Sequence, residues 1–182
     1  MKIRIHKTLS GSSANGPGIR NVVWFQGCDL GCPGCFNPKT HDPNKGRAFS
    51  ARHLCGMLTA PEVPCCGITI SGGEPFQQPA GLLKLLQELD ARQSPPILVF
   101  SGYPYSKLQQ NPLTAACLLH IDALICGPYR ADLEPDYEHF CSSSNQKLIL
   151  LSKRFSYQDF KNLPLHEWII DSSEITISGI IS

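Results

Sequence analysis

The stretch Gly27-Cys-Asp-Leu-Gly-Cys-Pro-Gly-Cys-Phe36 follows directly on a run of β-branched and aromatic residues, Ile19-Arg-Asn-Val-Val-Trp-Phe-Gln26. The apolar run predicts a buried strand, so the stretch after it is a loop at the strand's carboxyl end. This loop holds three cysteines in the spacing C-x3-C-x2-C: Cys28, Cys32 and Cys35. On a helix this spacing would place all three on one face, but the glycines and the proline between them favour an irregular loop that wraps around a bound group.

Three thiols in so short a loop indicate a metal or an iron–sulfur cluster. A closed structural zinc site needs four ligands, and a fully ligated four-iron cluster needs four thiolates. Three thiolates therefore leave one metal position open, which suits a cluster that binds a substrate or cofactor at its free iron. Two alternatives stay open at this point: zinc with a distant fourth ligand, His41 or His53, and thiols without a metal.

Short apolar runs alternate with helical patterns along the rest of the chain. Further strands are expected at 68–71, 97–101, 122–126, 147–151 and 167–170, and helices at 50–59, 79–91, 113–120 and 157–162. Such alternation is typical of βαβ units and a parallel sheet. The six predicted βα repeats are too few for a closed eight-stranded barrel, which takes about 250 residues. We therefore expect one α/β domain over residues 1–182, a partial and open (β/α)6 barrel with its site at the carboxyl ends of the strands.

The composition favours a protein of a reducing compartment. Nine cysteines are too few for a disulfide scaffold, and their odd number favours metal or redox chemistry. The net charge of +1 gives no sign of nucleic-acid binding. No apolar run approaches the ~18 residues of a transmembrane helix, and residues 1–6 show no signal-peptide core. We expect a cytoplasmic protein with neither a membrane nor a nucleic-acid partner.

The cysteine loop resembles the signature of the radical S-adenosylmethionine enzymes. Asn15-Gly-Pro-Gly-Ile-Arg20 resembles the D/N-G-P-G-x-R segment of activases of glycyl radical enzymes. Cys32-Pro-Gly-Cys-Phe-Asn-Pro38 resembles the C-P-G-C-[Y/F/W]-N segment of the activases of anaerobic ribonucleotide reductase. The resemblance continues through four more segments: Ile70-Ser-Gly-Gly-Glu-Pro75, Phe100-Ser-Gly-Tyr103, Asp122-Ala-Leu-Ile-Cys-Gly-Pro-Tyr129 and Ser143-Ser-Asn-Gln146.

The resemblance implies two cofactors, a [4Fe–4S] cluster and S-adenosylmethionine, and a set of residues to hold them. The three loop cysteines would be the cluster ligands, and Gly72, Gly73 and Glu74 would lie against the amino-acid end of S-adenosylmethionine. Gly34 and Phe36, which flank Cys35, would lie near its adenine, Cys35 itself would be a cofactor-binding residue as well as a cluster ligand, and Ser101 would lie near the polar end. The alternatives are a plain β-turn at 71–75, core packing for Phe36 and an ordinary turn residue at Ser101.

The function implied is reductive cleavage of S-adenosylmethionine to a 5′-deoxyadenosyl radical, which takes a hydrogen atom from a backbone glycine of a partner enzyme. The expected partner is a glycyl radical enzyme, first of all anaerobic ribonucleoside-triphosphate reductase, with a flavodoxin or ferredoxin-type protein as electron donor. One alternative is a small radical enzyme acting on a metabolite, similar to the 7-carboxy-7-deazaguanine synthases, or on a precursor peptide. The other is a non-catalytic iron–sulfur or zinc module.

Four residues depart from this pattern or have an open role. Cys126 stands where relatives commonly carry an Asp that helps to hold a monovalent cation, so such a site is in doubt, and we expect a small buried thiol rather than a hydrogen-atom donor. Cys65 and Cys66 are expected to be free thiols. Arg20 is expected either to meet carboxylates of the cofactor or partner, or to be a solvated charge at a strand edge.

Overall fold

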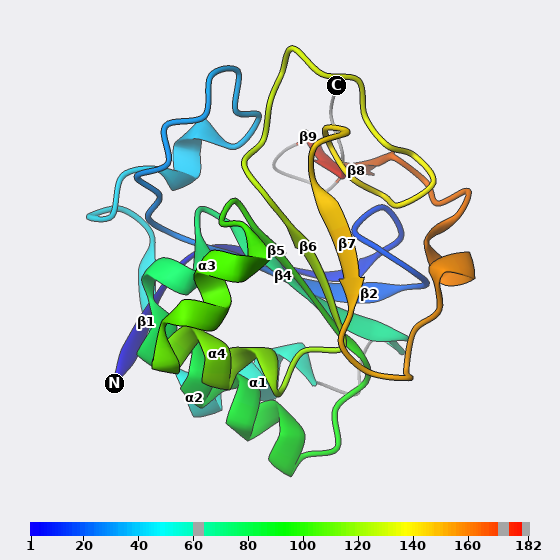
Figure 1. The fold of residues 1–182 in the computed structure, drawn as a ribbon. Helices are drawn as coiled ribbons and strands as arrows, with labels where there is room; N and C mark the ends of the chain where they lie inside the picture. The colour runs from blue at the N-terminus through cyan, green and yellow to red at the C-terminus, as the bar shows by residue number, and fades with distance from the viewer. Residues whose placement is uncertain (60–63, 171–174, 180–182) are drawn as a thin grey trace.

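The computed structural model describes residues 1–59, 64–170 and 175–179, and its centre is a seven-stranded sheet (Figure 1). The strand order is β3-β1-β2-β4-β5-β6-β7. The strands are β1 (Lys2–Ser12), β2 (Arg20–Phe25), β3 (Arg47–Ser50), β4 (Gly67–Gly72), β5 (Ile97–Ser101), β6 (Ala123–Cys126) and β7 (Lys147–Leu150). The four middle strands, β2, β4, β5 and β6, pair in parallel, which confirms the α/β class with a mainly parallel sheet.

The prediction of six βα repeats is wrong for the last two strands. The fifth predicted strand is β7, which pairs antiparallel with β6. No helix lies in the connection between them, so the chain turns back at the same end of the sheet, whereas a parallel return needs a crossover. The sixth predicted strand is β8 (His166–Ile170), which leaves this sheet and pairs antiparallel with β9 (Ile175–Gly179) in a separate two-stranded sheet.

Four α-helices gather on one side of the sheet (Figure 1). They are α1 (Ala51–Leu58), α2 (Pro79–Ala91), α3 (Tyr105–Gln110) and α4 (Pro112–Leu118). The predicted helix at 79–91 has the observed bounds, and Ser50 caps α1 as its hydroxyl accepts a hydrogen bond from the amide of His53 at 3.2 Å. The apolar face of α2 packs in one core with Ile68 and Ile70 of β4 and with Val99 of β5. The stretch at 157–162 forms only a short 3₁₀ turn, Tyr157–Phe160.

The opposite face of the sheet is covered by irregular chain rather than by helices. Here Leu98 of β5 and Ile125 of β6 form a second core with Phe140 and Phe160, which come from the segments after β6 and after β7. The loop before β2 closes the same face, because Gly16 lies so near Leu98 that a Cβ would sit 2.7 Å from its Cδ2. The sheet is therefore an open, filled half-barrel, and its free space lies at the ends of the strands.

Arg20 corrects both expectations for that residue. Its side chain is fully buried at the start of β2 and donates hydrogen bonds to the hydroxyl of Thr69 at 2.6 Å and to the carbonyls of Ile68 and Pro96 at 2.7 and 3.0 Å. Burial lowers the pKa of Arg20 to about 10. These bonds join the amino ends of β2, β4 and β5, so the guanidinium organises the end of the sheet remote from the site.

The remaining cysteine expectations agree with the structure. Cys126 is buried in the helix-side core, and Cys65 and Cys66 are free thiols, the first half-buried and the second exposed. Among the described residues, no helix has the length and apolar character needed to cross a membrane.

Candidate functional site

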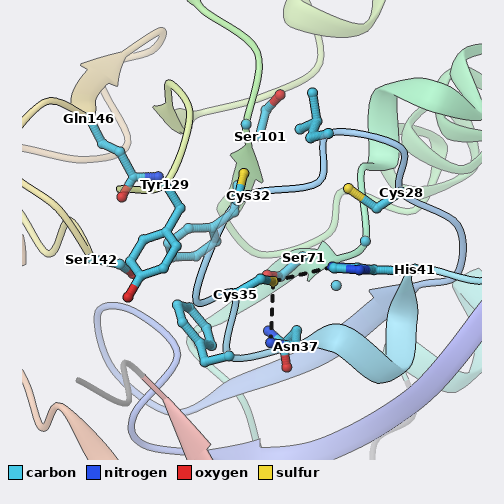
Figure 2. Close-up of a pocket in the computed structure, with 16 residues that line it drawn as sticks. Cys28, Cys32, Cys35, Asn37, His41, Ser71, Ser101, Tyr129, Ser142 and Gln146 are labelled. Carbon is cyan, nitrogen blue, oxygen red and sulfur yellow. Dashed lines mark hydrogen bonds between the residues drawn. The ribbon is translucent and has the colours of Figure 1, made fainter. Parts of the chain in front are cut away.

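A cavity lies at the carboxyl ends of β2, β4 and β5, where the sequence places the site (Figure 2). The cysteine loop contributes the three cysteines and Phe36, the ends of β4 and β5 contribute Ser71, Gly72, Gly73, Ser101 and Gly102, and the connection after β6 contributes Tyr129, Ser142 and Gln146. Seven of the nine predicted site residues thus line one cavity. The other two, Gly34 and Glu74, are not among the residues that line it.

The cysteine loop is anchored to the segment that follows it. The amide of Gly27 donates to the carbonyl of Thr40 at 2.7 Å, and the amide of Cys28 donates to the carbonyl of His41 at 3.0 Å. Cys35 Sγ accepts the amide of Asn37 at 3.4 Å and lies 3.4 Å from His41 Nε2 (Figure 2). These bonds fix the loop at both ends and leave its thiols facing the cavity.

The three thiols suit a cluster better than a single ion. Cys28, Cys32 and Cys35 are free and half-buried, and burial raises the pKa of Cys28 and of Cys35, so binding iron requires loss of their protons. In the part of the chain that the structure describes, no three Cys, His, Asp or Glu side chains converge as ligands of one ion. Each thiolate of a cluster binds its own iron, so a cluster needs no such convergence.

Of the two histidines considered as a fourth zinc ligand, only His41 lies at the cavity. His41 lines the cavity beside Cys35, although no role was expected for it beyond this alternative. His53 is exposed on α1, where its ring stacks on Phe49 with centroids 5.6 Å apart.

The Gly72–Gly73 turn packs the end of β4 against the cysteine loop. Gly72 has a φ of +110°, a conformation that favours glycine. A Cβ on Gly73 would lie 2.3 Å from the carbonyl oxygen of Gly27 and 3.1 Å from that of Thr40. Glycine at position 73 is therefore needed for a second reason besides the predicted approach of a ligand, because it lets two loops of the site touch.

Glu74 is buried behind the residues that line the cavity and makes hydrogen bonds to two of them. Its side chain is fully buried, and its carboxylate accepts hydrogen bonds from the amides of Phe76 at 3.0 Å and Gly102 at 2.7 Å and from the hydroxyl of Ser101 at 3.0 Å. Burial raises the pKa of Glu74 to about 7, against the opposing effect of these donors. Glu74 therefore holds Ser101 and Gly102, which do line the cavity, in place.

An aromatic pair forms one wall of the cavity. The rings of Phe36 and Tyr129 meet edge to face, with centroids 5.4 Å apart and planes at 83°. Gly34 has a φ of +71°, and its Cβ would meet that of Ala131 at 2.8 Å, so it lets the connection after β6 approach the cysteine loop.

Tyr129 and Gln146 are site residues that the sequence analysis did not select. Gln146 reaches the cavity while its Nε2 donates to the carbonyl of Gly127 at 3.1 Å. Both lie inside segments on which the family resemblance rests, and that was the signal available for them.

Comparisons with known proteins agree with this geometry. A family model described as a 4Fe-4S single cluster domain matches residues 14–149. The anaerobic ribonucleoside-triphosphate reductase-activating protein of Escherichia coli K12 is 31% identical over 138 residues, which are 72% of this chain and 88% of that protein. The pyruvate formate-lyase-activating enzyme of Clostridium pasteurianum is 34% identical over 65% of this chain and 53% of its own length.

A third similarity is shorter. The 7-carboxy-7-deazaguanine synthase of Methanothermobacter thermautotrophicus is 37% identical over 83 residues, but these are only 42% of this chain and 34% of that enzyme. The relatives matched over most of the chain are activating proteins, and the family model that matches residues 14–149 describes a single 4Fe-4S cluster. The chain therefore belongs to the radical S-adenosylmethionine activases of glycyl radical enzymes, which work with a [4Fe–4S] cluster and S-adenosylmethionine.

Proposed function

We propose that this chain installs a glycyl radical on anaerobic ribonucleoside-triphosphate reductase or on a closely related glycyl radical enzyme. The observation that supports this most is the single cavity that joins three cluster-type thiols to the Gly72–Gly73 turn and the Phe36–Tyr129 wall. The choice of partner is supported by the relative that is named after this reductase, because the match with this chain covers 88% of that relative's length.

In this proposal each side of the cavity holds a different part of the cofactor pair. Cys28, Cys32 and Cys35 would hold the cluster, and three thiolates would leave it able to bind S-adenosylmethionine. Bound together, the two cofactors supply a one-electron cleavage that produces a 5′-deoxyadenosyl radical. The protein contributes the orientation of both cofactors and the exclusion of water.

The contacts to S-adenosylmethionine are assigned by chemistry and position. The backbone of Gly72 and Gly73 and the hydroxyl of Ser101 are polar groups at the strand ends, and we assign them to its amino-acid end. The ring of Phe36, backed by Tyr129, offers an apolar face, and we assign it to the adenine. Glu74 positions Ser101 and Gly102 without facing the cavity itself.

The partner's glycine loop would enter on the side of Tyr129 and Gln146, opposite His41 and Cys28 in Figure 2. A flavodoxin or ferredoxin-type protein would supply the electron. We also propose a cytoplasmic location, which a reducible cluster and nine free thiols support, since both suit a reducing compartment.

The test is radical transfer to the partner. Incubation of the reconstituted protein with S-adenosylmethionine, a reductant and the reductase of the same cell should give the doublet EPR signal of a glycyl radical, absent when the radical-bearing glycine is alanine. Formation of 5′-deoxyadenosine with a small metabolite or a precursor peptide, without a radical on any candidate partner, would contradict the proposal.

A further inference from the structure

The charges of this chain are divided along the sequence, although the net charge is nearly zero. Residues 1–53 hold eight Lys and Arg but only two Asp, a net charge of +6, and residues 54–182 hold eight Lys and Arg against thirteen Asp and Glu, a net charge of −5. Fields of this kind steer charged partners to one side of a protein.

Part of the positive charge lies in the segment that follows the cysteine loop and runs into α1. Four exposed cations lie between residues 39 and 52, with Asp42 as the only acidic side chain among them: Lys39, Lys45, Arg47 and Arg52. We call these four residues the basic edge. Contacts with β1 hold the segment, since Arg4 Nη1 donates to the carbonyls of Asn44 and Lys45 at 3.1 and 3.2 Å and Arg47 pairs with Ile5 of β1.

The basic edge is connected to the cysteine loop by short contacts. His41 lies in the same segment, accepts the amide of Cys28 on its carbonyl at 3.0 Å and places Nε2 3.4 Å from Cys35 Sγ. Gln26, at the end of β2, donates from its side chain to the carbonyls of Lys39 and Asp42 at 3.1 and 2.8 Å. A protein seated on Lys39 and Lys45 would therefore contact the segment that holds His41, whose Nε2 lies 3.4 Å from Cys35 Sγ.

The other side of the cavity carries the opposite charge. Beyond Tyr129 the chain runs through four acidic residues within seven positions, Asp132, Glu134, Asp136 and Glu138. In Figure 1 this yellow segment lies at the upper right of the molecule, and the light blue segment around residue 40 lies at the upper left. The segment of Lys39 and Lys45 should therefore attract an acidic protein more than the segment after Tyr129, where Arg130, paired with Asp132, is the cation among four acidic residues.

We propose that the basic edge is the docking surface for an acidic one-electron carrier protein that reduces the cluster through the His41 side of the loop. The inference rests on the proposed function, because it presumes that the three cysteines hold a cluster. One electron passes from the reduced flavin or iron–sulfur centre of the carrier to the cluster, so the carrier is oxidised by one electron and no bond is made or broken. Charge complementarity mainly accelerates the encounter, and salt weakens it.

The test compares two reductants on one pair of variants. Lys39→Glu/Lys45→Glu reverses two charges of the basic edge, and Lys153→Glu/Lys161→Glu makes the same change in net charge at two exposed lysines elsewhere. Each anaerobically reconstituted protein is mixed in a stopped-flow instrument with a reduced acidic flavodoxin, or with photoreduced deazaflavin as a small neutral reductant. Binding of the oxidised flavodoxin is measured separately by calorimetry.

We expect the basic-edge variant to be reduced by flavodoxin at least about tenfold more slowly at low ionic strength, with weaker flavodoxin binding, while deazaflavin reduces it at the wild-type rate. The control variant should match the wild type in both, and the difference should shrink as salt is added. Equal flavodoxin rates and affinities for all three proteins would overturn the proposal.

A second outcome would assign the surface to the activated enzyme instead. If the basic-edge variant takes electrons from flavodoxin normally but fails to activate the reductase with deazaflavin, the docking proposal is wrong. If no form of the protein binds a cluster, the proposed function fails, and that result is separate from the docking test.

Discussion

Alanine at Gly73 is the sharpest test of how the site is assembled. The new Cβ would lie 2.3 Å from the carbonyl oxygen of Gly27, about 0.7 Å inside the 3.0 Å limit that Cβ atoms respect. The neighbour is backbone, so it has no rotamer through which to move away. The amide of Glu74 also donates to this carbonyl at 2.9 Å, so separating the loops strains or breaks that bond.

The cost follows from these contacts. Overpacking of a tight site costs about 1–3 kcal/mol, and a weakened hydrogen bond adds about 1 kcal/mol. We therefore expect Gly73→Ala to lower the free energy of unfolding by roughly 2–4 kcal/mol. For a domain of this size that corresponds to a melting temperature lower by roughly 5–15 °C. Gly27 precedes Cys28, so cluster incorporation should fall as well.

The assay is thermal unfolding of the metal-free protein by circular dichroism, followed by iron analysis after anaerobic reconstitution. Gly56→Ala is the matched control, because nothing lies within 4 Å of its Cβ position in α1 and alanine is the better helix former. It should be neutral or stabilising by up to about 1 kcal/mol. A Gly73→Ala protein that melts with the wild type and binds as much iron would refute the packing argument.

Three further predictions concern the same site. Burial raises the pKa of Glu74 to about 7, so the protonated carboxyl group contributes its full stability below about pH 4.5, and this contribution is lost as the pH rises to about 7. Over that range the unfolding free energy of the metal-free wild type should fall by about 3 kcal/mol relative to Glu74→Gln. Parallel pH profiles for the two proteins would contradict this prediction. His41→Phe removes a nitrogen 3.4 Å from Cys35 Sγ and should lower the cluster potential by roughly 20–60 mV in an EPR redox titration, whereas an unchanged potential would show that no hydrogen bond to sulfur exists. Alanine at any of the three loop cysteines should abolish the cluster in iron analysis while Cys117→Ala, a buried thiol of the helix-side core, retains it; intact clusters in all three loop variants would disprove the ligand set.

The parts of the fold that the sequence predicts well are those with strong local periodicity. The leucine stripe of α2 and the apolar runs of β4, β5 and β6 are buried patterns that tertiary contacts reinforce. β1 was overlooked although Ile3 and Ile5 alternate with exposed or half-exposed neighbours, and β3 was overlooked because its four residues are mostly exposed. The predicted parallel direction of β7 was wrong, since an apolar run does not show which way the chain enters the sheet.

The site residues were predictable where local chemistry, of the side chain or of the backbone, requires one residue type. Three thiols in one loop and two glycines at a strand end need no knowledge of the rest of the fold. The buried position of Glu74, the wall formed by Phe36 with Tyr129 and the contact of His41 with Cys35 all depend on long-range packing, which one sequence does not display. The basic edge was hidden for a simpler reason, because the net charge of +1 averages two halves of opposite sign.

The most direct test of the central claim follows the hydrogen atom. The reductase is produced with deuterated glycine and incubated with this protein, S-adenosylmethionine and a reductant, and the 5′-deoxyadenosine is analysed by mass spectrometry. The account predicts one deuterium in the 5′-deoxyadenosine, formed together with the glycyl radical on the reductase. Cleavage of S-adenosylmethionine in the presence of the reductase without transfer of deuterium would contradict it.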